Sequence, residues 1–578
     1  MGFLSSLNKR DTYLLTCILL CTLACLLTLF IPSAKLSDLY HASGFYLLFI
    51  SFSCWVYLSL PRRTSKTEIM LFIQQQGWAV LLFTLVVALM FAVSPIQFRV
   101  LADETNLLGI ANSMYQEHSF ENRTSALFYF NQQHKIDSEW GIRPNVFPFL
   151  IYVMHSLKGY SAYNGFIVNA IAAVSCLWTF SWLLSRYFQR SLAILGAISL
   201  AAFPVFVLWV TSSGFEIVNL ALALIAFCWF YQYQQDHDGY HLERLALTLV
   251  LLAQTRYESA VFVFTLGLTV LLMLRTPHLQ KLSFRLSLAP FFFLPIAWQR
   301  LIKTDKADYQ VVGNDAIFSI DNWLKHIELA WQYFTSAKAL YGTISIIFYL
   351  ALAGFLIAII QLIRHRKTRT RSTSAMLIAA TLSLTALIAV IFAYFWGNLT
   401  ASFTIRLGII FLPFIITLAI FALEQIARKM AFSHKLSAKA LLILGFSLCL
   451  FYWPTAAKNE AAQTLTLNRQ YQTLLTYLQQ HHPQRNILIV TERPGLYSVH
   501  HWGAVDFNYA NNHHRRIKRD LSRNLYQEVL MIQLIDYKTG EAINGTNLTA
   551  DFDMKVEFEA QFSATAKMRI SRLQEGSR

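Results

Sequence analysis

The sequence predicts an all-α polytopic membrane protein with a small α/β domain at its carboxyl end. Of its 578 residues, 55% are hydrophobic and only 14% are charged, whereas a soluble domain of this length needs more polar surface. Apolar stretches of about 20 residues, the length of a helix that crosses a bilayer, recur along the chain. Basic residues concentrate in alternate loops between these stretches, which is the pattern of a multispanning topology.

Hydropathy predicts thirteen crossings. Eleven are single spans, at residues 12–31, 42–60, 77–94, 163–184, 192–210, 217–233, 286–302, 343–363, 375–395, 407–426 and 440–457. The other two are a hairpin, 245–255 and 259–274, whose limbs are separated only by Arg256-Tyr257-Glu258. The first span resembles a signal peptide but is too long and has no convincing cleavage site, so we expect it to be retained.

The distribution of Lys and Arg predicts the orientation. With the amino terminus in the cytoplasm, the inner loops hold twenty Lys and Arg residues, and the short outer loops hold only Lys35, Arg256 and Arg406. The carboxyl terminus is then outside. This topology accounts for most of the net charge of +16, so nucleic acid is not an expected partner.

Three regions follow from this topology. Residues 1–94 form amino-terminal spans, 95–457 form a membrane region with outer loops 95–162 and 303–342, and 458–578 form the outer α/β domain. In the first outer loop, an apolar stripe from Leu107 to Tyr115 predicts a helix lying on the membrane, and 145–157 is expected to be interfacial or re-entrant. In the tail, strand patterns cover 486–491, 529–535 and 552–562.

Charged residues near the outer edge of the spans are the candidate site. Ionisable groups at a bilayer are rare and are usually functional. Asp103-Glu104 lies nine residues after a span, where a solvated loop is the simpler interpretation. Glu216 follows a very short turn, Ser212 to Phe215, and a carboxylate there also stabilises a helix amino terminus.

The remaining candidates are a hairpin and a late arginine. Arg256 and Glu258 either serve the site or pair with each other across one turn. Arg406 begins a span, and a boundary arginine is often an anchor whose charged end reaches the interface. Anchors of this sign belong on the inner face, which favours a functional role for Arg406.

In their order along the chain these residues resemble the GT-C glycosyltransferases, and within them the protein O-mannosyltransferase (family 39) group that includes the lipid A aminoarabinose transferases. The resemblance covers about residues 95–426. Its motifs, in order along the chain, are Asp103-Glu104 in the first outer loop, the segment from Arg143-Pro144 to Pro148, the acidic Glu216 in the next outer turn, the Arg-x-Glu motif at Arg256 to Glu258, and Arg406-Leu followed by Pro413. The chain lacks the His-Pro-Pro and Trp-Trp-Asp elements of relatives, so the resemblance does not identify the acceptor. It also has two extra spans before the Asp-Glu loop.

The resemblance implies transfer of a sugar from a polyprenyl-phosphate carrier to a lipid or protein acceptor at the outer face, in a bacterial inner membrane. It implies that the catalytic carboxylates are Asp103 and Glu104, with Asp103 as general base on the acceptor hydroxyl. Arg143, Arg256 and Arg406 would stabilise the phosphate, and Glu104, Glu216 and Glu258 would orient arginines or bind sugar hydroxyls. No cofactor is expected to be required, and nothing in the sequence supports a divalent metal.

Two other classes fit part of the pattern. A transporter or flippase for a polyprenyl-linked glycan would also be basic inside and charged near the outer face. Transporters place charge near the midplane in broken helices and contain internal repeats, and this sequence has no repeat. A sensor whose tail binds a ligand would leave the outer-face charges without a role.

Overall fold

The structure, a computed structural model, describes residues 16–574 apart from 24–25, 27, 61–65, 142, 274–285, 287, 305–316, 337–343, 365–370, 430–437, 464–465, 484–485, 544–546, 549–551, 562 and 564. It divides into two compact units, each made of two chain segments. Met1–Gln97 and Phe166–Ala462 form the first, here called the membrane unit. Phe98–Gly165 and Gln463–Arg578 form the second, here called the sheet unit. The predicted span 12–31 lies partly outside the described residues.

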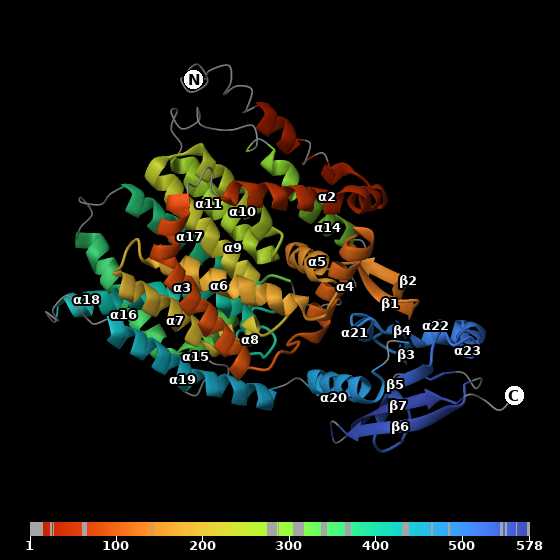
Figure 1. Ribbon diagram of the computed structural model, residues 1–578. Coiled ribbons are helices and arrows are strands. Elements are labelled where there is room, and N and C mark those ends of the chain that lie inside the picture. The colour runs from red at the N-terminus through yellow and green to blue at the C-terminus, as the bar shows by residue number, and fades with distance from the viewer. Residues whose placement is uncertain are drawn as a thin grey trace. The chain divides into compact units, whose positions relative to one another are not determined.

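The membrane unit is built from helices. They are α2 (Ser33–Ser59), α3 (Lys66–Val93), α6 (Asn164–Leu184), α7 (Arg190–Ala202), α8 (Pro204–Val210), α9 (Glu216–Asp236), α10 (Gly239–Ala253), α11 (Ala260–Met273), α14 (Leu294–Thr304), α15 (Ile320–Thr335), α16 (Ser345–Arg364), α17 (Arg371–Ala393), α18 (Leu412–Lys429) and α19 (Ala438–Gln463) (Figure 1). In the described parts of the chain, six helices are long and apolar enough to cross a membrane, or seven if α7 and α8 count as one span. The protein is therefore an integral membrane protein, and the figure of thirteen crossings stays a prediction.

The predicted span 192–210 is observed as two apolar helices, α7 and α8, rather than one continuous helix. The chain bends by 71° between α7 and α8, at Phe203-Pro204. Proline has no N–H to continue the helical ladder, and it fits at the first position of a new helix, where that donor would be unpaired anyway. The predicted hairpin at Arg256 is observed as α10 and α11, joined through the 3₁₀ turn η3 (Tyr257–Ser259).

The sheet unit contains seven strands, β1 (Glu121–Tyr129), β2 (Gln132–Trp140), β3 (Ile487–Thr491), β4 (Gly503–Val505), β5 (Glu528–Asp536), β6 (Met554–Gln561) and β7 (Ala566–Leu573). Their order across the sheet is β2-β1-β4-β3-β5-β7-β6. β3 is parallel to β4 and β5, and the other neighbours are antiparallel. The three predicted tail strands are confirmed as β3, β5 and β6. A core that includes Leu127, Leu488 and Val529 packs on the sheet.

The first outer loop contributes a hairpin that the sequence did not predict. β1 and β2 are joined by Phe130 and Asn131, which have φ values of 52° and 60°. Positive φ at both central residues characterises the type I′ turn, whose twist suits a two-residue hairpin. Ala126 of β1 pairs with Ala504 of β4, so the loop and the tail share one sheet. The loop therefore belongs to the same compact unit as the tail, which the predicted boundaries 95–457 and 458–578 had separated.

The helices of this loop are α4 (Leu101–Glu117) and α5 (Val146–Lys158). The predicted membrane-facing stripe lies on α4, but Leu107, Leu108 and Met114 are fully buried inside the sheet unit. The prediction that these residues face lipid is therefore wrong, because α5 and the β1 strand pack on α4 instead. The segment 145–157 is a helix of thirteen residues, too short for a full crossing at 1.5 Å per residue.

Candidate functional site

Glu216 begins α9, directly after the turn Ser212 to Phe215. Its side chain is only 1% exposed, which is rare for a carboxylate. Asn169 of α6 donates from Nδ2 to the carbonyl oxygens of Ser212 and Gly214, both at 2.8 Å, and so holds the turn in place. The carboxylate at the first position of α9 also lies where the helix dipole favours negative charge.

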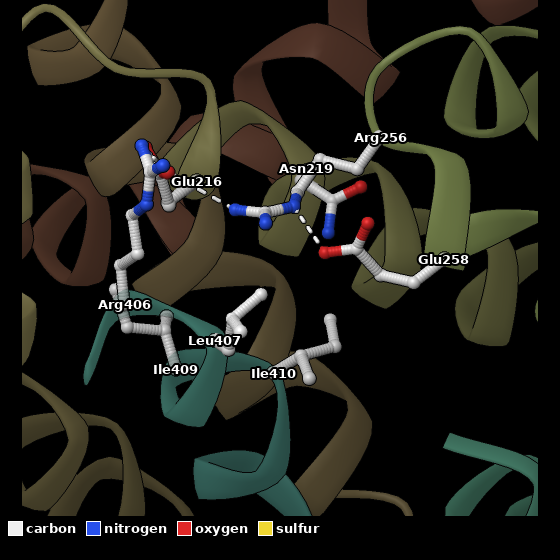
Figure 2. Close-up of a pocket in the computed structure, with 8 residues that line it drawn as sticks. All are labelled: Glu216, Asn219, Arg256, Glu258, Arg406, Leu407, Ile409 and Ile410. Carbon is white, nitrogen blue, oxygen red and sulfur yellow. Dashed lines mark hydrogen bonds and ion pairs between the residues drawn. The ribbon is translucent and has the colours of Figure 1, made fainter. Parts of the chain in front are cut away.

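Arg256 joins two carboxylates. Its Nη1 donates to Oε1 of Glu216 at 3.0 Å, and its Nε donates to Oε1 of Glu258 at 2.5 Å (Figure 2). Ser259, in the same turn, donates to Oδ1 of Asn219 on α9 at 2.6 Å. The η3 turn is thereby tied to the helix that carries Glu216, which fixes the direction of the guanidinium.

Arg406 approaches Glu216 from the opposite side. It lies in the 3₁₀ segment η5 (Ile405–Phe411), just before α18, and its Nη1 is 3.1 Å from the same Oε1 atom that accepts from Arg256. The guanidinium carbons of Arg256 and Arg406 lie 4.7 and 5.9 Å from the ring centroid of Phe215. An aromatic ring attracts cations through its quadrupole, so Phe215 helps to keep both arginines together.

These groups line a small pocket in the membrane unit, with Asn219 beside them and an apolar wall from η5 (Figure 2). The wall consists of Leu407, Ile409 and Ile410. Two arginines and two glutamates carry formal charges that cancel. The pocket therefore offers aimed N–H donors rather than a large net charge, and Arg256 uses two of its five donors in the bonds to Glu216 and Glu258.

One oxygen of Glu216 has no hydrogen-bond partner among the described residues. Oε1 receives both arginines, whereas Oε2 is buried and accepts no hydrogen bond from them or from any other described group. Gly214 explains how it fits, because a Cβ atom at position 214 would lie 2.3 Å from Oε2. A buried carboxylate oxygen without a donor is costly, so Oε2 is a group that the rest of the site must compensate.

Asp103 and Arg143 meet in the sheet unit. Asp103 lies in the first turn of α4, and its Oδ1 accepts from Nη2 of Arg143 at 2.5 Å and from Nε at 3.1 Å. Both side chains are partly accessible, at 12% for Asp103 and 28% for Arg143. A charge-assisted pair of this kind orients the carboxylate.

Glu104 has contacts that differ from those expected of a catalytic group. It is 1% exposed, and its Oε1 accepts from the backbone N–H groups of Arg99 and Val100 at 2.8 and 2.9 Å. These bonds cap the amino-terminal end of α4, where backbone N–H groups otherwise lack partners. Burial lowers the pKa of the neighbouring Arg99 to about 9, and the charge of Glu104 opposes that shift.

The structure thus brings four of the predicted residues into one pocket, Glu216, Arg256, Glu258 and Arg406, and pairs Asp103 with Arg143 in the sheet unit. Sequence reasoning missed Asn169, Phe215 and Asn219. Asn219 had a usable signal, since it lies three residues after Glu216 and so on the same helix face. Within the described residues, no group of three or more His, Cys, Asp or Glu side chains is placed to hold a metal ion.

The sequence matches no protein-family model and no curated protein. Among solved structures, the chain is similar to ArnT from Cupriavidus metallidurans bound to undecaprenyl phosphate, at 14% identity and a TM-score of 0.47, covering 86% of this chain and 98% of ArnT. It is also similar to the Archaeoglobus fulgidus oligosaccharyltransferase, at 11% identity and a TM-score of 0.43, covering 80% and 69%. A third match is the arabinosyltransferase EmbB from Mycobacterium smegmatis, at 11% identity and a TM-score of 0.34, covering 72% and 44%. Similarities this distant carry no argument about function, which rests on the residues of the chain itself.

Proposed function

We propose that the protein is a glycosyltransferase that moves a sugar from a polyprenyl-phosphate carrier to a lipid or protein acceptor at the outer face of a bacterial inner membrane. The observation that carries the proposal is the pair of guanidinium groups of Arg256 and Arg406, held on one buried carboxylate in a pocket of the membrane unit. Planar guanidinium forks match phosphate oxygens, and an apolar wall beside them suits a lipid-linked donor.

The chemistry requires stabilisation of a leaving phosphate. The acceptor oxygen forms a bond to the anomeric carbon, the bond from that carbon to the phosphate oxygen breaks, and the polyprenyl phosphate departs with the electron pair. Negative charge on the phosphate grows in this step, so donors aimed at it stabilise the transition state more than the ground state. Glu216 and Glu258 keep Arg256 in place before the donor arrives, which lowers the cost of reorganisation.

The general base is proposed to be Asp103, which takes the proton of the acceptor hydroxyl. The proposal rests on its place in the Asp-Glu sequence and on its partly accessible carboxylate, oriented by Arg143. Glu104 is proposed as a positioning residue, since its bonds to the backbone N–H groups of Arg99 and Val100 hold the first turn of α4, which carries Asp103.

The decisive experiment follows the donor bond. Purified protein is given a radiolabelled polyprenyl-phosphate sugar, and release of free polyprenyl phosphate is measured. The wild type is expected to release it in the presence of acceptor, whereas Arg256→Ala and Arg406→Ala bind the donor more weakly, each losing about 1.5 to 3 kcal/mol. Arg428→Ala is the matched control, because Arg428 is 67% exposed and pairs with Glu424 on its own helix, away from the pocket lining. Movement of intact glycolipid across the bilayer without cleavage would instead establish the transporter.

The outer-face location is tested by topology. Reporter fusions after Pro61, Lys281 and Arg371 are expected to report the cytoplasm, and a fusion after Lys458 is expected to report the outside. The expectation follows from the bias of twenty basic residues against three. A cytoplasmic tail would remove the outer face as the place of reaction.

A further inference from the structure

Helix α23 (His514–Ser522) of the sheet unit presents a strongly basic surface that the proposed transfer reaction does not use. Arg515, Lys518 and Arg519 are exposed, as is Arg523 directly after the helix. Its apolar residues, Ile517 and Leu521, are buried in the core of the sheet unit. The helix is therefore fixed by its apolar face, and the cations on its other side are exposed to solvent.

Three of these four cations lack a carboxylate partner in the part of the chain that the structure describes. Within the described residues, Arg515, Lys518 and Arg523 form no ion pair, and Asp520, the one acidic residue of α23, is 3.5 Å from Arg516 and 3.8 Å from Arg519. Strand β7 of the same unit is different. Each of its three cations has a carboxylate partner, as the half-buried Lys567 and Arg569 bind Glu559 and the exposed Arg572 bridges Glu528 and Glu557.

The spacing of the α23 cations forms a row. Arg515, Arg519 and Arg523 are four residues apart, so successive side chains lie on one side of the helix. At 1.5 Å per residue the row spans about 12 Å. Like charges held in such a row repel one another, and a linear partner that carries regularly spaced negative charge would relieve that repulsion.

The surroundings of the row narrow the choice of partner. Large exposed hydrophobic residues do not occur on α23, which is described in full. A protein interface has an apolar or aromatic core, a membrane-surface helix buries an apolar face, and single-stranded nucleic acid stacks on aromatic rings. We propose that α23 and Arg523 form a binding surface for a linear acidic polysaccharide, held by its carboxylate, sulfate or phosphate groups.

The test uses the full-length protein in neutral-lipid nanodiscs and a fluorescent heparin oligosaccharide as the probe, with neutral dextran as reference. The variant Arg515→Gln/Lys518→Gln/Arg523→Gln removes three cations that form no ion pair with the described residues. The control Lys567→Gln/Arg569→Gln/Arg572→Gln removes the same charge from the paired cations of β7. Since an exposed charge contact contributes up to about 1 kcal/mol, the α23 variant is expected to bind heparin about 10- to 100-fold more weakly, and the control is expected to bind like the wild type.

The proposal would be overturned if the α23 variant bound heparin as tightly as the wild type. It would also be overturned if the control lost as much affinity as the α23 variant, because only net charge would then matter. A third contrary result is a single-stranded oligonucleotide of equal charge that binds as tightly as heparin and loses affinity equally in the α23 variant. Thermal unfolding of both variants checks that they are folded. The assay involves no sugar transfer, so its outcome is separate from that of the proposed function.

Discussion

The contact between Gly214 and Glu216 allows the arginine site to be disturbed without touching either arginine. A Cβ atom at position 214 would lie 2.3 Å from Oε2 of Glu216, so the carboxylate must move by about 1 Å to reach ordinary contact in Gly214→Ala. The atom in the way is the far end of a flexible side chain, and the φ angle of Gly214 is not in the left-handed region. We therefore expect the variant to fold.

The displacement acts on the site through hydrogen bonds. Arg256 and Arg406 both approach Oε1 of Glu216, at 3.0 and 3.1 Å, and a shift of about 1 Å misaligns both. A misplacement of that size costs up to about 100-fold where positioning matters. We expect polyprenyl phosphate to bind the Gly214→Ala variant about 10- to 100-fold more weakly.

The assay is a titration of detergent-solubilised protein with a fluorescent polyprenyl phosphate. Gly267→Ala is the matched control, because a Cβ atom there meets no atom within 4 Å and the residue lies in a helix of the same unit. A melting temperature near that of the control would show that the fold is intact. Equal affinity of Gly214→Ala and Gly267→Ala for polyprenyl phosphate would refute the reasoning that Glu216 positions the arginines for the phosphate.

Four further predictions follow. Asp103→Asn is expected to lower the rate of sugar transfer by about two to four orders of magnitude with donor affinity unchanged. Asp137→Asn, at an exposed position, is its control. Full activity of Asp103→Asn would exclude Asp103 as the base. Glu258→Gln is expected to weaken polyprenyl-phosphate binding, because the carboxylate of Glu258 holds the Nε of Arg256 in place, and tighter binding would contradict this. Chelation with EDTA is expected to leave transfer unchanged, and its loss with recovery on adding Mg²⁺ would establish a metal requirement. Burial, assisted by His501, lowers the pKa of His500 to about 4, so the stability that neutral His500 contributes is present above about pH 6.5 and is lost as the pH falls toward 4. In thermal unfolding, the melting temperature of His500→Gln is therefore expected to fall less steeply with decreasing pH than that of the wild type. An unchanged pH dependence of the melting temperature would count against this.

The membrane class and the candidate charges followed from the sequence because both are local signals. A span of about 20 apolar residues must satisfy its own backbone as a helix, so hydropathy alone locates most helices of the membrane unit. The same cost makes charge rare beside the bilayer, and this rarity singled out Glu216, Arg256, Glu258 and Arg406. The structure places these four side chains around one pocket, although 190 positions separate the first and last of them.

Only the tertiary structure decided which segments share a unit and what each carboxylate contacts. The β1–β2 hairpin has no Asn-Gly turn and joins the tail through a pairing of Ala126 with Ala504, a contact between segments far apart in the chain that no local pattern encodes. Asp103 and Glu104 are adjacent in sequence, yet Asp103 forms an ion pair with Arg143, whereas Glu104 accepts from backbone N–H groups at the amino-terminal end of α4. Neighbours on a helix point about 100° apart, so their surroundings, and with them their chemistry, are set by whatever packs on each face.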